Sequence, residues 1–521
     1  MRTLFMAFTC LLTTSILHAQ FKTVAEGPVF NEPESGYSKI LLLKNGTTAF
    51  FNITFKDGII VKIYDANHQQ KADKVIKPAY GKLKRASVNA IFELKGDIIL
   101  LISETDGRTP VLYRLIVDGS TGELKDEKQI AELKKLALQS IGFTTQNIPL
   151  SSFYVRKDPY SDNYAVAMFN SSETDRSKII EVVLYANDHK EISRGMYESP
   201  DETYKYIRYI DMTVIGDKKV SIMAVAHNAR KNKESQLLLA NLNAGESKLS
   251  IKELTFAQDR QVEWGLTRYN PLTKKVLLVV AAKVVDKKYE YEPFLCKIDP
   301  FSQKIESSVV LNPEGLTEKY YGMPQNLFIN KDGSFTIVYE DMEVRSGTTG
   351  SRNQMSYLET RLGKIAISLY DKNEKHQISY LIKKAQFLNG IGLEPFYLSN
   401  REGAAQSMFY GSQFKSFAYL NGGTKNYVLL NDIEKNREST RGDKLTPISG
   451  LGECDGYYFD VSGSATEPER NFVFGKPADK KIHNMALFAI SDYNSDANIY
   501  TTLKLEKNGK EKGVRVIWLQ P

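Results

Sequence analysis

The strongest constraint in this sequence is a four-part unit that recurs along almost its whole length. It is plainest at residues 264–311, which contain WGLTRYNP, KKVLLVVAAK, EPFLCKIDP and QKIESSVVL, four short apolar runs separated by turn residues. The runs are rich in Val, Ile, Leu and aromatic residues, which favour a largely buried, pleated strand. Pro beside Asn or Asp ends a strand and starts a turn. The unit therefore predicts a four-stranded antiparallel meander of the size of a propeller blade.

Six further units have the same form. In the first of them, Asn45-Gly46 and Asp57-Gly58 separate apolar runs and predict tight hairpins, because a primed turn needs a positive φ. The segment Ile130–Gln139 interrupts the pattern, and its apolar residues follow a helical period, which predicts one short amphipathic helix. The six units begin at Ser38, Val88, Ser152, Tyr206, Asn326 and Phe414.

The two ends of the chain complement each other. Residues 486–521 contain ALFAISDYNSDA, NIYTTLKLEKNG and VRVIWLQP, which make three strands and not four. The extended segment Phe21–Phe30 is left over at the other end and can supply the missing outer strand. Pairing the ends would close a ring and leave no sheet edge exposed. The sequence therefore predicts an all-β, single β-propeller over residues 20–521, with eight blades favoured and seven as the alternative if the seventh and last pieces merge.

The N-terminus predicts export. Arg2 precedes a mostly apolar stretch from Leu4 to Leu17, and Ala19 offers a small residue for signal-peptidase cleavage, so residues 1–19 read as a signal peptide. No later run approaches the roughly 20 apolar residues of a membrane span. Cys296 and Cys454 fall two units apart, and no disulfide is expected between them. The net charge of +7 is modest and mixed along the chain, and with the export signal it argues against nucleic acid as a partner.

The links between strands differ in length in a regular way. Links between first and second runs are tight, as at Lys331-Asp332-Gly333, whereas links between second and third runs lengthen, notably Asp341 to Gly363 and Asp432 to Asp455. Links between units also lengthen, as at Phe387 to Gln406. Both long classes emerge on the same face of a propeller. Long loops on a rigid scaffold are where binding usually resides, so we expect that face to bind a partner.

These long links lean basic and aromatic, which suits an anionic or sugar-bearing partner held by Arg and Lys and stacked on Tyr. Acidic neighbours such as Glu290 and Glu434 balance part of this charge, so ordinary solvated loops are the alternative. The predicted partner is an envelope protein or glycan. The candidate binding residues are Arg230, Lys287, Tyr289, Tyr291, Arg345, Arg352, Tyr357, Arg361, Arg437 and Arg441.

Catalytic signatures are missing from the sequence. It contains no Gly-x-Ser-x-Gly, His-Glu-x-x-His, Walker or dinucleotide-binding motif, and no cofactor or metal is predicted. Asp492–Asn498 resembles the start of a calcium loop, but Ala497 replaces the Gly of the sharp turn, so a self-capping turn is preferred. His227 is the one histidine worth testing. A binding protein is therefore favoured over an enzyme, with a polysaccharide hydrolase or lyase using carboxylates such as Glu340, Asp341 or Glu343 as the alternative.

The closing stretch HNMALFAISDYNSDANIYTTLKLEKNGKEKGVRVIWLQP, together with NYVLLNDI and the His-Ala-Gln-Phe start, resembles uncharacterised exported proteins of Bacteroidota-type bacteria. The resemblance spans most of the chain after the signal peptide and implies a propeller-like fold and a bacterial origin. Its motifs are structural, so it carries over no catalytic residue. The chain ends on Pro521 beside a predicted strand, with no sorting domain after it. We therefore expect the protein in the periplasm, or peripheral to the cell envelope or extracellular.

Overall fold

The computed structural model describes residues 21–521 apart from a set of short segments, so the predicted signal peptide 1–19 lies outside the described residues. Side chains are also left undescribed at residues 176, 348–349, 355–356, 437–438, 506–508 and 511–512. The undescribed segments are 34–35, 55–57, 80–85, 137–151, 171–172, 199–203, 205, 228–234, 257–259, 285–290, 350–354, 391, 394–416, 423–424, 439–444, 480–481 and 509–510.

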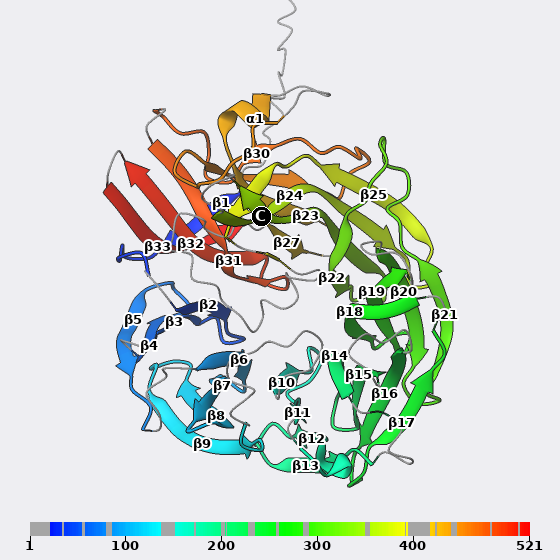
Figure 1. Ribbon diagram of the computed structural model, residues 1–521. Coiled ribbons are helices and arrows are strands. Elements are labelled where there is room, and N and C mark those ends of the chain that lie inside the picture. The colour runs from blue at the N-terminus through cyan, green and yellow to red at the C-terminus, as the bar shows by residue number, and fades with distance from the viewer. Residues whose placement is uncertain are drawn as a thin grey trace, which may run out of the picture.

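The described strands form eight antiparallel sheets arranged in a ring, and the first strand is innermost in every blade except the last, whose outer strand comes from the N-terminus (Figure 1). The predicted eight-bladed β-propeller is confirmed. Blades 1 and 2 are β2 (Tyr37–Leu42), β3 (Thr48–Thr54), β4 (Gly58–Tyr64) and β5 (Gln70–Ile76), then β6 (Ser87–Leu94), β7 (Asp97–Asp106), β8 (Thr109–Asp118) and β9 (Leu124–Glu132). Blades 3 and 4 are β10 (Ser152–Lys157), β11 (Tyr164–Phe169), β12 (Ile180–Tyr185) and β13 (Glu191–Met196), then β14 (Tyr206–Ile215), β15 (Lys219–His227), β16 (Ser235–Asn243) and β17 (Ser250–Leu254).

The second half of the ring repeats the arrangement and adds one strand to blade 6. A 3-10 turn, η2 (Arg176–Lys178), precedes β12, and one short helix, α1 (Glu434–Glu438), follows β28. Blades 5 and 6 are β18 (Arg260–Asn270), β19 (Lys275–Val284), β20 (Tyr291–Asp299) and β21 (Lys304–Val310), then β22 (Met323–Ile329), β23 (Phe335–Thr349), β24 (Met355–Tyr370) and β25 (His376–Ile382), with β26 (Gln386–Asn389) beside β24. Blades 7 and 8 are β27 (Ala418–Asn421), β28 (Asn426–Asp432), β29 (Asp455–Asp460) and β30 (Asn471–Phe472), then β31 (Ile482–Asn494), β32 (Ile499–Asn508), β33 (Glu511–Gln520) and β1 (Lys22–Glu26).

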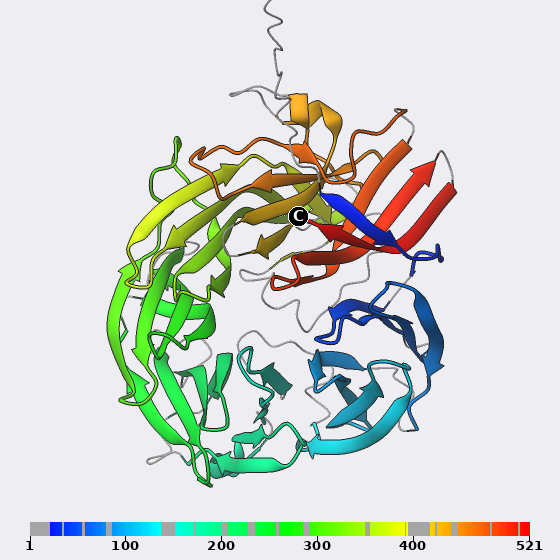
Figure 2. The ribbon, with the colours of Figure 1, turned by 180° about the vertical axis from the view of Figure 1, so that it is seen from behind.

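The two ends of the chain close the ring in blade 8. The N-terminal strand β1 pairs antiparallel with β33, with Lys22 opposite Gln520 and Glu26 opposite Ile517. Both views show the N-terminal strand lying beside the C-terminal one (Figures 1 and 2). The carboxylate of Glu26 pairs with Lys504 at 3.2 Å and with Arg515 at 2.9 Å. The predicted closure is confirmed, and with it the count of eight blades over seven.

The strands are held by apolar side chains packed between neighbouring blades. Every residue of β15 is buried, because both faces of its sheet are covered by the adjacent blades. At the closure, Trp518 is fully buried, its ring lies 5.1 Å from Tyr64 and 4.6 Å from His68, and its Nε1 donates to Thr48 Oγ1 at 2.9 Å. Burying a large apolar side chain contributes about 1.5–3 kcal/mol, so these inter-blade contacts carry much of the stability.

The helix predicted over Ile130–Gln139 is wrong for the residues that the structure describes. Residues 130–132 finish β9, and residues 133–136 form no helix. Ile130, Ala131 and Leu133 pack instead into the apolar cluster between blades 2 and 3. Pairing of β9 with β8 therefore overrides a weak local helical period, as tertiary contacts often do. In the described part of the chain no helix is long and apolar enough to cross a membrane.

Candidate functional site

Chain topology separates two faces of the ring. In an antiparallel four-stranded blade, the first-to-second and third-to-fourth links lie on one face, and the second-to-third and between-blade links lie on the other. We call the latter the long-link face. Its most extended element is the hairpin of blade 6, β23 with β24, whose strands have 15 and 16 residues. Sequence reasoning expected a long irregular loop over Asp341–Gly363, but most of it continues the two strands.

The hairpin projects past the body of its blade. The inner strand β22 pairs with β23 only from Phe335 to Glu340, and a register shift follows at Asp341. Beyond that shift, β23 and β24 remain paired as far as Thr349 opposite Met355. The short strand β26 pairs with the other edge of β24, with Asn389 opposite Glu359. The projecting part is therefore a three-stranded sheet, and we call it the blade-6 hairpin.

One face of the blade-6 hairpin carries alternating charges. Glu343 lies opposite Arg361, and Arg345 lies opposite Glu359. Directly opposed residues share a face of a sheet, and so do residues two apart along a strand, so all four side chains lie on one face. Arg345 Nη2 lies 2.7 Å from Glu343 Oε2, and Arg361 Nε lies 2.6 Å from Glu359 Oε1. Arg345 and Arg361 thus each have an acidic partner.

Tyr357 extends this charged face toward the tip of the hairpin. It lies opposite Gly347, and a Cβ added at Gly347 would come within 2.8 Å of its ring. Glycine therefore leaves room for the ring to lie across the strand. Tyr357 is 45% exposed, which leaves aromatic surface available for stacking.

The opposite face of the blade-6 hairpin is apolar. Near the blade, Met342 and Leu362 pack on Leu388 and Leu393, which gives the hairpin a small core of its own. Farther out, Val344 is 44% exposed, and its neighbour Leu358 is 39% exposed. The hairpin is therefore amphipathic, with an apolar face that its own core covers only in part.

Four buried charges lie at the base of this face, in and after blades 6 and 7. Lys384 forms an ion pair with Glu340, and both side chains are 0% exposed. Arg470 Nη1 lies 2.9 Å from Asp432 Oδ2, also buried. Gln386 accepts from Lys384 Nζ at 3.4 Å and donates at 3.1 Å to the carbonyl of Asn431, the residue before Asp432. Sequence reasoning missed this cluster, because its members come from separate strands and links.

The carboxylates near the hairpin base differ in what they can do. Glu340 is buried and neutralised by Lys384, so it does not face solvent. Burial raises the pKa of Asp432 above its usual range, and the positive charge of Arg470 opposes this rise. Burial also raises the pKa of Asp341, and the nearby charge of Glu318 adds to that effect. Glu343, paired with Arg345, has a lowered pKa and stays ionised. Of the three carboxylates suggested by the sequence, Asp341 is the one that is partly exposed and has a raised pKa.

Three other candidates that the structure describes, Tyr291, His227 and Arg437, belong to other blades. Tyr291 belongs to β20 in blade 5, where its ring lies 5.3 Å from Trp264 and its hydroxyl donates weakly to Glu263 at 3.4 Å. His227 is buried, with its ring 5.3 Å from Tyr206. Arg437 lies in α1, but its side chain is outside the description. The candidates outside the described residues are Arg230, Lys287, Tyr289, Arg352 and Arg441.

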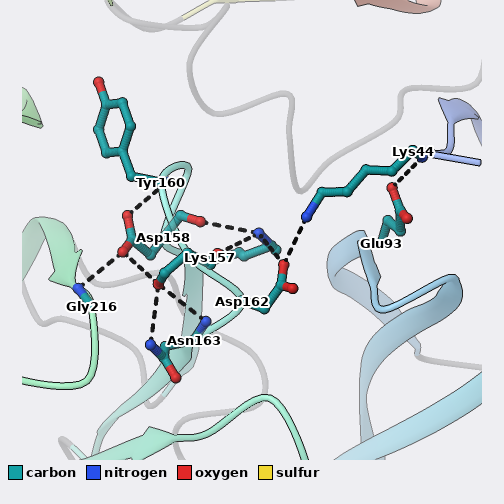
Figure 3. Close-up of polar contacts among 9 residues, drawn as sticks. Lys44, Glu93, Lys157, Asp158, Tyr160, Asp162, Asn163 and Gly216 are labelled. Atoms are coloured by element: carbon teal, nitrogen blue, oxygen red, sulfur yellow. Dashed lines mark hydrogen bonds and ion pairs between the residues drawn. The ribbon is translucent and has the colours of Figure 1, made fainter.

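The short-turn face is built from self-capping turns. In the turn after β10, Asp158 Oδ2 accepts from Ser161 Oγ at 2.6 Å and from the Gly216 amide of blade 4 at 2.9 Å (Figure 3). Asp162 binds Lys44 of blade 1 at 3.1 Å. In the related turn of blade 8, Asn494 accepts from two backbone amides, which fits the predicted self-capping turn. Among the residues described, no group of three His, Cys, Asp or Glu side chains could hold a metal ion.

Comparisons with known proteins assign no activity to this chain. The chain matches no protein-family model and no curated protein. It is similar in structure to a quinohemoprotein alcohol dehydrogenase from Comamonas testosteroni, at 12% identity and a TM-score of 0.38 over 83% of this chain and 68% of that one. It is also similar to the β-propeller domain of the Trilobed protease from Pyrococcus furiosus, at 10% identity and a TM-score of 0.33 over 82% of this chain and 97% of that one. A third similar structure is the polysaccharide lyase Uly1, at 10% identity and a TM-score of 0.36 over 86% of this chain and 92% of that one. Likenesses this distant assign no function, and none bears on the bacterial origin implied by the sequence resemblance.

Proposed function

We propose that this protein is an exported, non-enzymatic β-propeller that binds a protein or glycan partner of the cell envelope through its long-link face. In this proposal residues 1–19 are a cleaved signal peptide, residues 20–521 form a single domain, and the protein works in the periplasm or at the periphery of a Bacteroidota-type envelope. The observation that carries the proposal is the blade-6 hairpin. It extends two strands well past the blade and presents Arg345, Arg361 and Tyr357 on one exposed face.

The chemistry of that face suits a polar partner of mixed charge. Arginine forks bind carboxylate, sulfate or phosphate groups in pairs of hydrogen bonds, and a tyrosine ring stacks on a sugar or a peptide side chain. The exposed ion pairs cost little to rearrange, because such pairs contribute only about 0–1 kcal/mol. A partner that offers its own carboxylates could therefore replace Glu343 and Glu359 beside the arginines.

The experiment compares two matched variants of the exported protein. Arg345→Ala/Arg361→Ala removes two cations from the hairpin, whereas Lys218→Ala/Lys372→Ala removes two exposed cations from turns on the short-turn face. Tagged wild-type and variant proteins are used to capture partners from envelope extracts and on a glycan array. We expect the hairpin variant to lose at least about tenfold in captured partner, which corresponds to 1.4 kcal/mol, and the control to match wild type. Equal capture by both variants would refute the hairpin as the binding element.

The alternative is a polysaccharide hydrolase or lyase, and one observation favours it. Asp341 has a raised pKa in a partly buried position, and the carboxylate of Glu318 is near enough to raise it further. Two carboxyl groups of different pKa suffice for glycoside cleavage. Glu318 forms an ion pair with Lys364 at 2.6 Å. Product release from a panel of acidic and neutral polysaccharides, abolished in Asp341→Asn and kept in Glu343→Gln, would support the enzyme over the binding protein.

A further inference from the structure

Along the blade-6 hairpin, the described residues leave open the inner edge of β23, the edge that β22 occupies within the blade. Beyond Asp341 this strand pairs with β24 on one side only, because β22 begins opposite Glu340. Among the residues described, no other strand and no further backbone hydrogen bond occupies the edge from Met342 to Thr349. An open edge presents unpaired N–H and C=O groups and is a template for another strand.

The charges on this edge are self-complementary. If a second copy pairs antiparallel about a two-fold axis at Val344, Glu343 of each copy lies opposite Arg345 of the other. Within each copy, Glu343 already lies opposite Arg361, and Arg345 opposite Glu359. The joined sheet would then carry two rows of four side chains in which every neighbour has the opposite sign. Opposite charges across strands stabilise a sheet, and like charges destabilise it.

Other registers lose this match. A shift by one residue would place the charged face of one copy beside the apolar face of the other, because side chains alternate along a strand. A two-fold axis at Glu343 would oppose two glutamates, and one at Arg345 would oppose two arginines. The axis at Val344 also places the exposed Val344 side chains of the two copies side by side, on the face where Leu358 is exposed as well.

From this pattern we propose that the blade-6 hairpin joins two copies of this chain edge to edge, through antiparallel pairing of residues 342–346 of β23. The contact is isologous, so it closes at two copies and does not grow into a fibre. The paired segment is short, and interfaces below about 1,200 Å² are typical of weak, transient complexes. The dimer therefore forms in a concentration-dependent way. This inference does not depend on the envelope partner proposed above, and the hairpin face stays solvent-exposed in the dimer.

A pair of charge reversals tests the interface without relying on loss of function alone. Glu343→Arg sets arginine against arginine between identical copies, and Arg345→Glu sets glutamate against glutamate. Each variant alone should be monomeric by light scattering at concentrations where wild type dimerises. Mixed together, they restore both opposite-sign pairs, so a heterodimer should form. Each reversal also creates a like-charge pair within its own hairpin, and that pair is present whether the variants are separate or mixed. A gain in association on mixing therefore reports on the interface between the copies. Matching thermal unfolding curves before and after mixing would confirm that both variants stay folded.

Cysteine scanning then tests the register. Val344→Cys should form a disulfide-linked dimer under mild oxidation, because the two copies of this position are directly opposed. Ser346→Cys should not, because its two copies lie four strand positions apart, about 13 Å. Wild type that stays monomeric at every concentration, variants that fail to associate on mixing, or Ser346→Cys crosslinking better than Val344→Cys would each overturn the proposal.

Discussion

Lys384 lies against Glu340 in the interior of the long-link face, with neither side chain exposed to solvent. Lys384 follows the outer strand of blade 6, and Glu340 belongs to its second strand, at the point where the blade-6 hairpin leaves the blade. A buried ion pair of this kind is costly to break on one side only, because the remaining charge has no water around it.

Removing one member of this pair should therefore destabilise the protein strongly. We expect Lys384→Met to lower the free energy of unfolding by about 3–5 kcal/mol. The double variant Glu340→Met/Lys384→Met should recover most of that loss, since no unpaired charge remains. Chemical denaturation of the three proteins checks this. Lys364→Met, which breaks the exposed pair with Glu318, is the control and should cost under about 1 kcal/mol.

The ring closure offers a second prediction. Trp518 is fully buried between blades 8 and 1 and donates to Thr48. Trp518→Ala should cost about 3–5 kcal/mol, as deletion of a large core side chain usually does. Thr48→Val removes only the acceptor of the indole N–H and should cost about 1 kcal/mol. Thermal unfolding measures both. Equal losses for the two variants would mean that the hydrogen bond, and not the packing, secures the closure.

Two aspartates at equivalent turns predict an acid-sensitive loss of stability. Hydrogen bonds from Lys125 and from two backbone amides hold the pKa of Asp118 at about 2, and Lys275 does the same for Asp299. Their pKa in the unfolded chain is about 3.9. Because the folded pKa is the lower one, the folded state is stabilised fully above about pH 4, and that stabilisation is lost as the pH falls toward 2.

Denaturation midpoints measured between pH 2 and pH 6 test this slope. Asp118→Asn/Asp299→Asn should flatten the dependence of stability on pH in that window and leave the slope above pH 6 unchanged. An unchanged acid slope in the double variant would assign the acid sensitivity to other carboxylates.

The turn of blade 3 predicts a local effect. The carboxylate of Asp158 accepts from the Gly216 amide at 2.9 Å and so joins blade 3 to blade 4 (Figure 3). Asp158→Ala leaves that amide and the Ser161 hydroxyl without their acceptor, which should cost about 1–3 kcal/mol. Amide hydrogen exchange should accelerate at Gly216 and in its turn. Asp162→Ala removes the ion pairs with Lys44 and Lys157 but keeps the Asp158 carboxylate, and it should leave exchange at Gly216 unchanged.

Much of the fold was predictable because the signals are local. Asn45-Gly46 marks a turn wherever it stands, and alternating Val, Ile and Leu mark a strand, so the blades could be read one after another. The helix prediction at Ile130–Gln139 was wrong because the signals that decide this segment are not local. Its apolar residues were needed to finish β9 and the core beside blade 3, which a local period cannot reveal.

The candidate site was predictable only in part. The long-link face and the residues Arg345, Tyr357 and Arg361 emerged from the lengths and composition of the links. Their partners did not, because Glu343 and Glu359 become neighbours of the arginines only once the hairpin register is set. Tyr291, which the sequence assigned to the fifth unit, lies in blade 5 beside Trp264.

The sequence by itself determined the repeated four-stranded unit and predicted the completion of the last blade by the N-terminal segment, and it favoured eight blades with seven as the alternative. These follow from strand periodicity, turn chemistry and counting strands. Only the tertiary structure decided that residues 341–349 and 355–363 continue as paired strands of an amphipathic hairpin and that Lys384 and Glu340, 44 residues apart, share one buried site. The physical reason is that register and burial depend on which strands meet across space, and a one-dimensional pattern leaves those partners open.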